Sequence, residues 1–479
     1  MLPDRHSSRS YFFLWLCLGL LPLLSIAALL PVQPHDYWWY LRLGRDVLQT
    51  GNVPTVDTFS SSQTGQPVLY QSWLSAVLFW LLYKSGKIEV TVFIVVLLIG
   101  VVYAMLWMIL RQSGVGPRLA AGLTLLAGLS GSNNWGVRPQ LFAYPLFIAV
   151  LWILLKWQER KEAGMWLLIP LACLWANLHG SFVLLFLLAG IALVFGAGNR
   201  RKLFWILIAA LVVTLLNPRG ILLWVNVAET FFVPGVRNFS WEWLPPVNEG
   251  WQMNIFFAWF TLLIPLAAMT HRSLSRFEWM VFLVFAWLAL NGLRYVIWDL
   301  FIMAILTARL MPQQVVQRFD QPQVTKVPAL NYGLGAAMLC LPLVLLPGIR
   351  ETWWKAAPPA VDPQTPVAAA DWLQQHPELP GAMLNDVVFG SYLIHAVPSR
   401  PVWIDTRIQV AYTSKQAEDY LFVQSAREGW NEFLEQNGIH LLFLNRGQLD
   451  LIRAAEKSGA WCERYRDEYA IIFSRCEAK

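Results

Sequence analysis

The chain has 479 residues, of which 57% are hydrophobic and only 14% are charged. A soluble domain carries about 25% charged residues, so this composition excludes an ordinary soluble protein and indicates one that crosses a membrane many times. The net charge of +6 does not indicate a nucleic-acid partner. The basic residues lie in short loops between apolar runs and form no basic patch with interleaved aromatic residues.

Apolar runs near helix-spanning length predict a mainly α fold, a transmembrane bundle of about 11 spans. Several runs are shorter than about 20 residues, so tilted, broken or merged spans are expected. The first run is longer than a signal-peptide core and no small-x-small cleavage site follows it, so we expect it to be retained. The expected spans are residues 11–31, 88–110, 117–133, 139–156, 165–180, 182–197, 203–217, 253–270, 277–291, 294–310 and 329–347.

The distribution of basic residues predicts the orientation of these spans. With the N-terminus in the cytoplasm, 15 Lys and Arg residues fall on the cytoplasmic side and 8 on the other. The long loops 32–87 and 217–252 and the C-terminal region are then extracytoplasmic. Within the first loop, Trp73 to Tyr83 is apolar but too short to span, which predicts an interfacial or re-entrant helix.

Charged residues concentrate at the end of the chain, where residues 350–479 hold 30 of the 66. We therefore expect a membrane body over residues 1–349 and a small soluble domain over 350–479. In this second part amphipathic stretches alternate with short β-like runs, which predicts an α/β domain. The helical stretches are 366–376, 414–437 and 448–458, and the β-like runs are 382–384, 401–404, 440–444 and 469–473.

Two cysteines of this domain, Cys462 and Cys476, could form a disulfide in an oxidising compartment. A tight turn at Asp467-Glu468 would leave them out of register. A three-residue turn centred on Tyr469 would place them opposite each other, and the sequence leaves both possibilities open.

Polar residues from six segments gather at or just outside the external ends of the hydrophobic stretches. Because ionisable groups are costly at membrane depth, this convergence predicts a functional site at the outer surface. The residues are Asp36, Asp57, Arg138, Asn177, His179, Asn217, Glu242 and Arg294.

Each of these residues has a functional and a structural interpretation. Asp36 could deprotonate an acceptor hydroxyl or bind a metal, or it could be a hydrated acid in an interfacial aromatic belt. The aromatic run that contains Trp39 could stack on a sugar. Arg138, His179 and Arg294 together suit a phosphate, whereas either arginine alone could extend to lipid headgroups.

Asp299 lies inside the tenth expected span. We expect a structural ion pair with a neighbouring arginine there, with a proton relay as the alternative. The chain has no Walker A sequence, no zinc spacing of Cys and His, and no Gly-x-Ser-x-Gly. Soluble nucleotide, zinc and serine-hydrolase chemistries therefore have no support.

Several short motifs follow one another in a familiar order: Asp36-x-Trp38-Trp39-x-Leu41-x-x-Gly44, Arg138-Pro-Gln-Leu-Phe, Trp175-Ala-Asn-Leu-His-Gly, Asn217-Pro-x-Gly and Glu242-Trp-x-Pro-Pro. They resemble bacterial multi-span proteins with the GT-C glycosyltransferase architecture, a superfamily of protein O-mannosyltransferases, lipid A aminoarabinose transferases and oligosaccharyltransferases. The resemblance covers most of the membrane body and extends to Trp403-Ile-Asp-Thr-Arg407.

The resemblance implies a multi-pass protein of the bacterial inner membrane that transfers a sugar from a polyprenyl-phosphate donor to an acceptor at the outer surface. Asp36 would be the general base. Arg138, His179 and Arg294, with Asn177 and Trp39, would bind the donor and its departing phosphate. Asp57 and Glu242 would hold the acceptor or a divalent cation, and no cofactor is otherwise implied.

The chain departs from the pattern at two places. Similar proteins usually have His where this chain has Tyr40, and His-Glu where it has Gln71-Ser72. A different acceptor, or a non-catalytic membrane scaffold, would follow if that His and Glu are catalytic. A transporter or flippase of lipid-linked or small polar substrates is a further alternative, favoured only by Asp299.

Overall fold

A computed structural model describes residues 5–232, 241–270, 274–319, 327–379 and 381–476. The chain forms two compact units. The first, here called the bundle unit, comprises Met1–Leu30, Gly86–Asn217 and Trp241–Ala360. The second, the sheet unit, comprises Pro31–Ser85, Pro218–Ser240 and Val361–Lys479.

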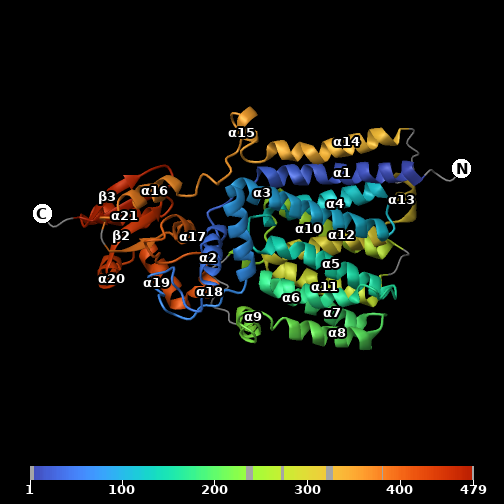
Figure 1. Ribbon diagram of the computed structural model, residues 1–479, viewed down its shortest axis with the longest axis horizontal. Coiled ribbons are helices and arrows are strands. Elements are labelled where there is room, and N and C mark those ends of the chain that lie inside the picture. Colours follow the sequence, from blue (N-terminus) through green and yellow to red (C-terminus); the bar gives the residue numbers. More distant parts are fainter. Residues whose placement is uncertain (1–4, 233–240, 271–273, 320–326, 380, 477–479) are drawn as a thin grey trace. The chain divides into compact units, whose positions relative to one another are not determined.

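The bundle unit is made of long helices that run side by side (Figure 1). Its α-helices are α1 (Arg5–Leu29), the second part of α3 (Trp73–Gln112), α4 (Pro117–Gly131), α5 (Gln140–Gln158), α6 (Leu168–Leu178), α7 (Val183–Phe195), α8 (Arg200–Val213), α10 (Gly250–Met269), α11 (Arg276–Asn291), α12 (Val296–Leu310), α13 (Gln313–Phe319), α14 (Pro328–Cys340) and α15 (Arg350–Trp353). Short 3₁₀ turns join them: η1 (Ser132–Asn134), η2 (Met165–Leu167), η3 (Gly180–Phe182), η5 (Trp241–Trp243), η6 (Leu293–Tyr295) and η7 (Leu341–Leu345).

Helix α12 forms the core of the bundle unit. All of its residues except Arg309 are buried, as expected for a helix that is apolar on every side. The indole of Trp298 packs against the rings of Tyr144 and Phe147, with centroids 5.1 and 4.9 Å apart. At the periphery, α1 lies along α4 and α14.

The chain is a polytopic membrane protein that is mainly helical, as predicted. Among the described residues five helices are long and apolar enough to cross a membrane, and a bent pair, Leu293–Leu310 with Gln313–Phe319, would make a sixth. The five are Arg9–Leu29, Trp73–Gln112, Gln140–Gln158, Gly250–Met269 and Pro328–Leu345. Shorter helices occupy the other expected spans, so the count of eleven stays a prediction.

The predicted short helix at Trp73 to Tyr83 is present and distinct from the span that follows. Helix α3 is interrupted at Gly86 (φ −174°, ψ 36°) and Lys87 (φ 52°, ψ −139°). A left-handed φ is uncommon for a residue other than glycine, and it marks a real break in the helix. The two parts of α3 belong to different units.

The sheet unit contains a four-stranded sheet in the order β1-β2-β4-β3, in which only β1 and β2 are parallel. Its elements are α2 (Tyr37–Thr50), the first part of α3, α9 (Leu222–Phe232), α16 (Val367–Gln375), β1 (Ala382–Asn385), α17 (Val387–Ala396), α18 (Ile408–Ala411), α19 (Ser414–Gln424), α20 (Trp430–Gln436), β2 (Ile439–Asn445), α21 (Leu449–Ser458), β3 (Trp461–Arg466) and β4 (Ala470–Arg475). The predicted C-terminal α/β fold is therefore confirmed.

Three details of that prediction were wrong. The run 401–404 is not a strand of the sheet, because Val402 pairs instead with Ser60 in an isolated parallel bridge. Strand β3 was missed. The expected helix 414–437 is two helices, since Gly429, with φ 88°, precedes α20 in a left-handed conformation.

The sheet unit extends beyond the expected domain 350–479 because parts of the two long loops cluster with it. Residues 59–62 explain much of this association. The N–H of Ser61 donates to the carbonyl of Val402 (2.8 Å), and that of Val402 donates to the carbonyl of Phe59 (3.1 Å). Residues 233–240 of the second loop lie outside the described residues.

Cys462 and Cys476 form a disulfide, which decides the question that the sequence left open. Cys462 faces Ser474 on β4, two residues before Cys476, and the Cα atoms of the cysteines are 5.1 Å apart. The disulfide thus joins two cysteines that are diagonal neighbours on β3 and just after the end of β4, and not directly opposite each other. The register of β3 and β4 shifts between Glu463 and Tyr465, so the pairing matches neither the tight turn at Asp467-Glu468 nor the three-residue turn at Tyr469.

Candidate active site

Helix α2 places Asp36 at its N-cap position and turns an aromatic face into the sheet unit. Gly44, within the first motif, explains how closely α2 approaches the first part of α3. A Cβ added at Gly44 would lie only 2.0 Å from the carbonyl oxygen of Ala76. Only glycine therefore permits this close packing of α2 against the first part of α3, which sets the position of the helix that Asp36 caps.

Two donors orient the carboxylate of Asp36. The hydroxyl of Thr406 donates to its Oδ1 at 2.5 Å, and the indole N–H of Trp39 donates to the same atom at 3.3 Å. Trp39 is only 4% exposed and stacks on Tyr40, with centroids 3.6 Å apart. This burial does not fit the expected stacking of Trp39 on a sugar, and its contact with Asp36 gives it an orienting role instead.

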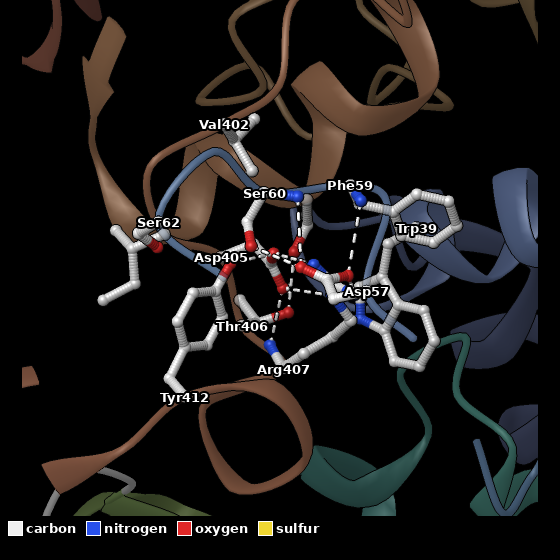
Figure 2. Close-up of polar contacts among 12 residues, drawn as sticks. Trp39, Asp57, Phe59, Ser60, Ser62, Val402, Asp405, Thr406, Arg407 and Tyr412 are labelled. Carbon is white, nitrogen blue, oxygen red and sulfur yellow. Dashed lines mark hydrogen bonds and ion pairs between the residues drawn. The ribbon is translucent and has the colours of Figure 1, made fainter. Parts of the chain in front are cut away.

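Asp57 belongs to a buried network around Arg407 (Figure 2). The Nη1 of Arg407 donates to Asp57 at 2.5 Å, while Nη2 and Nε donate to Asp405 at 2.7 and 2.9 Å. The hydroxyl of Tyr412 also donates to Asp405, at 2.6 Å. Asp57, Asp405 and Arg407 are each at most 1% exposed.

The network holds Asp57 ionised. Burial alone would raise the pKa of Asp57, but the Arg407 guanidinium and hydrogen bonds from Ser60 and the Phe59 N–H hold that pKa below its usual value. Burial also disfavours the charged form of Arg407, yet the Asp405 carboxylate holds the guanidinium's pKa well above its ordinary value. Asp57 is thus used within the fold, which does not fit the expected role in holding an acceptor or cation.

The segment that carries Thr406 and Arg407 is held by β1 and α17. Asn385 accepts a hydrogen bond from the Trp403 N–H (2.7 Å) and donates to the Ile404 carbonyl (2.7 Å). A Cβ at Gly390 would lie 2.2 Å from that same carbonyl. Glycine therefore lets α17 touch the backbone of the segment. Sequence reasoning assigned no role to Thr406 or Arg407, although both lie in the last motif of the resemblance.

In the bundle unit, Arg138, Glu242 and Arg294 come together. Arg138 forms an ion pair with Glu242, and the guanidinium of Arg294 lies over the Trp243 ring, 4.2 Å from its centroid. The N–H of Leu293 donates to the Leu244 carbonyl at 2.9 Å, which joins the two turns. Glu242 thus pairs with an arginine, and the described part of the cluster holds two guanidinium groups and one carboxylate.

His179 lies at the turn between α6 and α7, and Arg294 is near enough for its charge to act on the imidazole. The backbone N–H of Ser181 donates to Nδ1 of His179 at 3.1 Å. Because this N–H can only donate, Nδ1 is unprotonated, and the proton of a neutral imidazole lies on Nε2. His179 can therefore present a donor through Nε2, beside an arginine.

The side chain of Asn177 is 6% exposed and is hydrogen-bonded within the protein. Its Nδ2 donates to the Cys173 carbonyl at 2.9 Å, and its Oδ1 accepts from Asn217 at 3.1 Å. The amide pair joins the end of α6 to the chain after α8, and so connects two of the quoted motifs. This pairing does not fit direct donor binding by Asn177.

Asp299 corrects another expectation. Its side chain is fully buried in α12, and neither carboxyl oxygen has a hydrogen-bond partner in the described part of the chain. The expected ion pair with a neighbouring arginine is therefore wrong within those residues. No group of three or more His, Cys, Asp and Glu residues suited to a metal ion occurs in the same ranges.

No protein-family model matches the chain, and no curated protein matches its sequence. Its fold does match solved structures. One is the archaeal oligosaccharyltransferase AglB from Archaeoglobus fulgidus, in complex with an inhibitory peptide and a dolichol-phosphate, with TM-score 0.51, 11% identity, and 90% of this chain and 69% of that chain covered. Another is ArnT from Cupriavidus metallidurans bound to undecaprenyl phosphate, with TM-score 0.51, 12% identity, and 96% and 97% covered.

The arabinofuranosyltransferase AftD from Mycobacteria is also similar, with TM-score 0.55 and 14% identity. The matched region covers 96% of this chain but only 41% of AftD, so this chain spans less than half of that protein's length. Identities this low show the fold and not the reaction. The chain therefore shares the fold of these three transferases, as the resemblance of its motifs predicted.

Proposed function

We propose that the chain is a membrane glycosyltransferase that moves a sugar from a polyprenyl-phosphate donor to a hydroxyl acceptor. The observation that carries the proposal is the likeness, over 96% of this chain, to ArnT bound to undecaprenyl phosphate. AglB, in complex with a dolichol-phosphate, shares the fold as well. Two of these solved structures thus hold a lipid phosphate of the kind that the proposed donor would release.

The bundle unit supplies groups suited to the phosphate. Among the described residues, this cluster brings the guanidinium groups of Arg138 and Arg294 together with the carboxylate of Glu242. Guanidinium donors match phosphate oxygens bidentately, and His179 adds a neutral donor. The Arg138 side chain is 26% exposed, so it is only partly buried.

The sheet unit supplies the base. In the proposed step the Asp36 carboxylate takes the proton of the acceptor hydroxyl, whose oxygen forms a bond to the anomeric carbon of the donor sugar. The bond between that carbon and the phosphate oxygen breaks, and polyprenyl phosphate leaves with the electron pair.

The two departures from the family pattern bear on the acceptor. Tyr40 stacks on Trp39, and the Oε1 of Gln71 accepts a hydrogen bond from Asn226 at 3.3 Å. Tyr40 therefore packs within α2, and Gln71 contacts α9 in the same unit. We propose that the chain keeps the donor chemistry of its fold and takes an acceptor of its own.

The test uses the purified full-length protein with a panel of synthetic undecaprenyl-phosphate monosaccharides and a bacterial envelope extract as acceptor source. The expected result is consumption of one donor, release of undecaprenyl phosphate and appearance of a glycosylated product. Parallel reactions with a chelator or with added Mg²⁺ or Mn²⁺ show whether a divalent cation is required. A protein that binds a donor without consuming any would be a scaffold, contrary to the proposal.

We further propose that the protein lies in the bacterial inner membrane with a cytoplasmic N-terminus and an extracytoplasmic sheet unit. The Cys462–Cys476 disulfide supports this side, since disulfides persist outside the cytoplasm. Single cysteines at the exposed positions Ser399 and Lys161, in a background without Cys17, Cys173 and Cys340, test it. A membrane-impermeant thiol reagent should label whole spheroplasts only at Ser399→Cys, and labelling at Lys161→Cys instead would reverse the orientation.

A transporter of a lipid-linked substrate is the second candidate, and the buried Asp299 favours it. A carboxyl group inside a membrane bundle is a common site of proton coupling. In proteoliposomes, movement of a labelled undecaprenyl-phosphate sugar that Asp299→Asn abolishes would support transport. Sugar transfer that Asp299→Asn leaves at the parent rate would support the enzyme.

A further inference from the structure

Three hydroxyl and carboxyl groups from distant parts of the chain form one hydrogen-bonded series in the sheet unit. Thr406 contacts Asp36 through Oγ1 and Oδ1 at 2.5 Å. The same Oγ1 lies 2.6 Å from the Oγ of Ser391, a fully buried residue of α17. Figure 2 shows Thr406 next to the ion-pair network, one residue before Arg407 and one after Asp405.

The direction of the series follows from the number of protons. An ionised carboxylate only accepts, so the single hydroxyl proton of Thr406 goes to Asp36. Thr406 then accepts from Ser391, whose proton points along the series. The order of donation is Ser391 to Thr406 to Asp36, and each bond polarises the next toward the carboxylate.

The backbone around Thr406 is unusually constrained on both sides. The two chain neighbours of Thr406, Asp405 and Arg407, are fixed by buried ion pairs with each other and of Arg407 with Asp57. Two residues before Thr406, the Ile404 carbonyl accepts a hydrogen bond from Asn385 and lies close to Gly390. A threonine held by such contacts presents its hydroxyl at one place, which is what a group that orients a base must do.

We propose that Thr406 is a positioning residue for the Asp36 base. Thr406 comes from the C-terminal region, is supported by Ser391, and orients a carboxylate of the first long loop. This inference rests on the proposed function. The ion-pair network around Arg407 is then the support that keeps the hydroxyl in place, and the C-terminal region contributes to catalysis by orienting Asp36.

The experiment compares sugar transfer by the full-length protein and by Thr406→Val, which keeps the shape of the side chain and removes the hydroxyl. We expect kcat to fall about ten- to hundredfold with an unchanged KM for the donor, since a hydrogen bond to a charged group is lost. Thr406→Ser should restore most of kcat, and Ser391→Ala should reduce it by a smaller factor. Thr413→Val, which removes a cap of α19 in the same unit, is the matched control and should leave kcat unchanged.

A second comparison distinguishes positioning from a general loss of structure. In the Asp36→Asn background, Thr406→Val should lower the residual rate no further, because the group it orients has lost its basicity. Equal loss in both backgrounds, or a parent-like kcat for Thr406→Val, would overturn the inference. Failure of the proposed function looks different, because the parent protein itself would then transfer no sugar.

Discussion

The two clusters of charged residues in this chain differ in what their surroundings do with the charge. In the sheet unit, Asp57, Asp405 and Arg407 are at most 1% exposed and satisfy one another with short hydrogen bonds. In the bundle unit, the ion pair of Arg138 and Glu242 keeps 26% and 21% of its side-chain surface exposed. A closed network stabilises a fold, whereas an exposed cluster with an excess of one sign suits a ligand. Charge type alone did not separate Asp57 from Glu242, but burial does.

The largest expected effect comes from opening the closed network. Arg407→Met would leave Asp57 and Asp405 buried without a cation, and we expect a loss of about 3–5 kcal/mol in the free energy of unfolding of the sheet unit. Thermal unfolding of the purified protein measures it. Arg466→Met, which removes an exposed arginine paired with Glu456 and Glu463, should cost under about 1 kcal/mol. Similar losses for both variants would contradict a structural role for the network.

The disulfide provides a second test of the same unit. Replacing Cys462 and Cys476 together by serine should lower the free energy of unfolding by about 2–4 kcal/mol, because the unfolded chain regains the freedom of the closed loop. Unfolding of the parent protein with and without a reductant should reproduce that difference. A serine variant as stable as the parent would mean that β3 and β4 hold together without the bond.

For the exposed cluster the expected effect is on binding and not on stability. Arg294→Ala should weaken binding of undecaprenyl phosphate about ten- to hundredfold, since hydrogen bonds to a charged group are lost. Binding to the protein in nanodiscs measures it. Arg118→Ala, which removes an arginine packed against Tyr11 and Trp15, is the control and should bind normally. Equal weakening in both variants would mean that the cluster of Arg138, Glu242 and Arg294 has no special role in binding.

The smallest expected effect is a pH dependence. The pKa of Asp57 is lowered in the folded protein, so the unfolded state binds more protons between that value and the ordinary pKa of about 3.9. The stabilisation is therefore complete above the ordinary pKa and is lost as the pH falls below it. Between about pH 6 and about pH 3, Asp57→Asn should show a shallower decline in stability than the parent, and an equally steep decline would contradict the lowered pKa.

Much of the fold could be predicted from the sequence because hydrophobic periodicity and charge distribution act locally. The apolar runs gave the helical body, and the composition change near residue 350 gave the α/β region. The long-range pairing of Ser60 with Val402 could not be predicted, since nothing near residue 402 indicates a partner so far away in the chain. For the same reason β3, with its charged and half-exposed residues, carried no clear strand signal.

The candidate site shows the same limit. We expected Arg138, His179 and Arg294 to gather because all three lie near helix ends. In the structure Arg138 pairs with Glu242, and Arg294 lies over the neighbouring Trp243. Trp39 and Asp57 were expected to face a substrate, yet packing against Tyr40 and pairing with Arg407 bury both. The pairing of Asp57 depends on a residue far along the chain, Arg407. Thr406 lies in the last quoted motif, but nothing in that motif indicates its 2.5 Å contact with Asp36.

The central claim is that Asp36 is the base in sugar transfer from a polyprenyl-phosphate donor, and Asp36→Asn tests it most directly. The substitution keeps the shape of the side chain and removes its basicity, so we expect transfer to fall about 10²–10⁴-fold while undecaprenyl-phosphate binding is retained. Asp46→Asn, on the same helix and paired with Arg42, should transfer at the parent rate. Transfer by Asp36→Asn at the parent rate would contradict the claim and make Asp36 an ordinary interfacial acid.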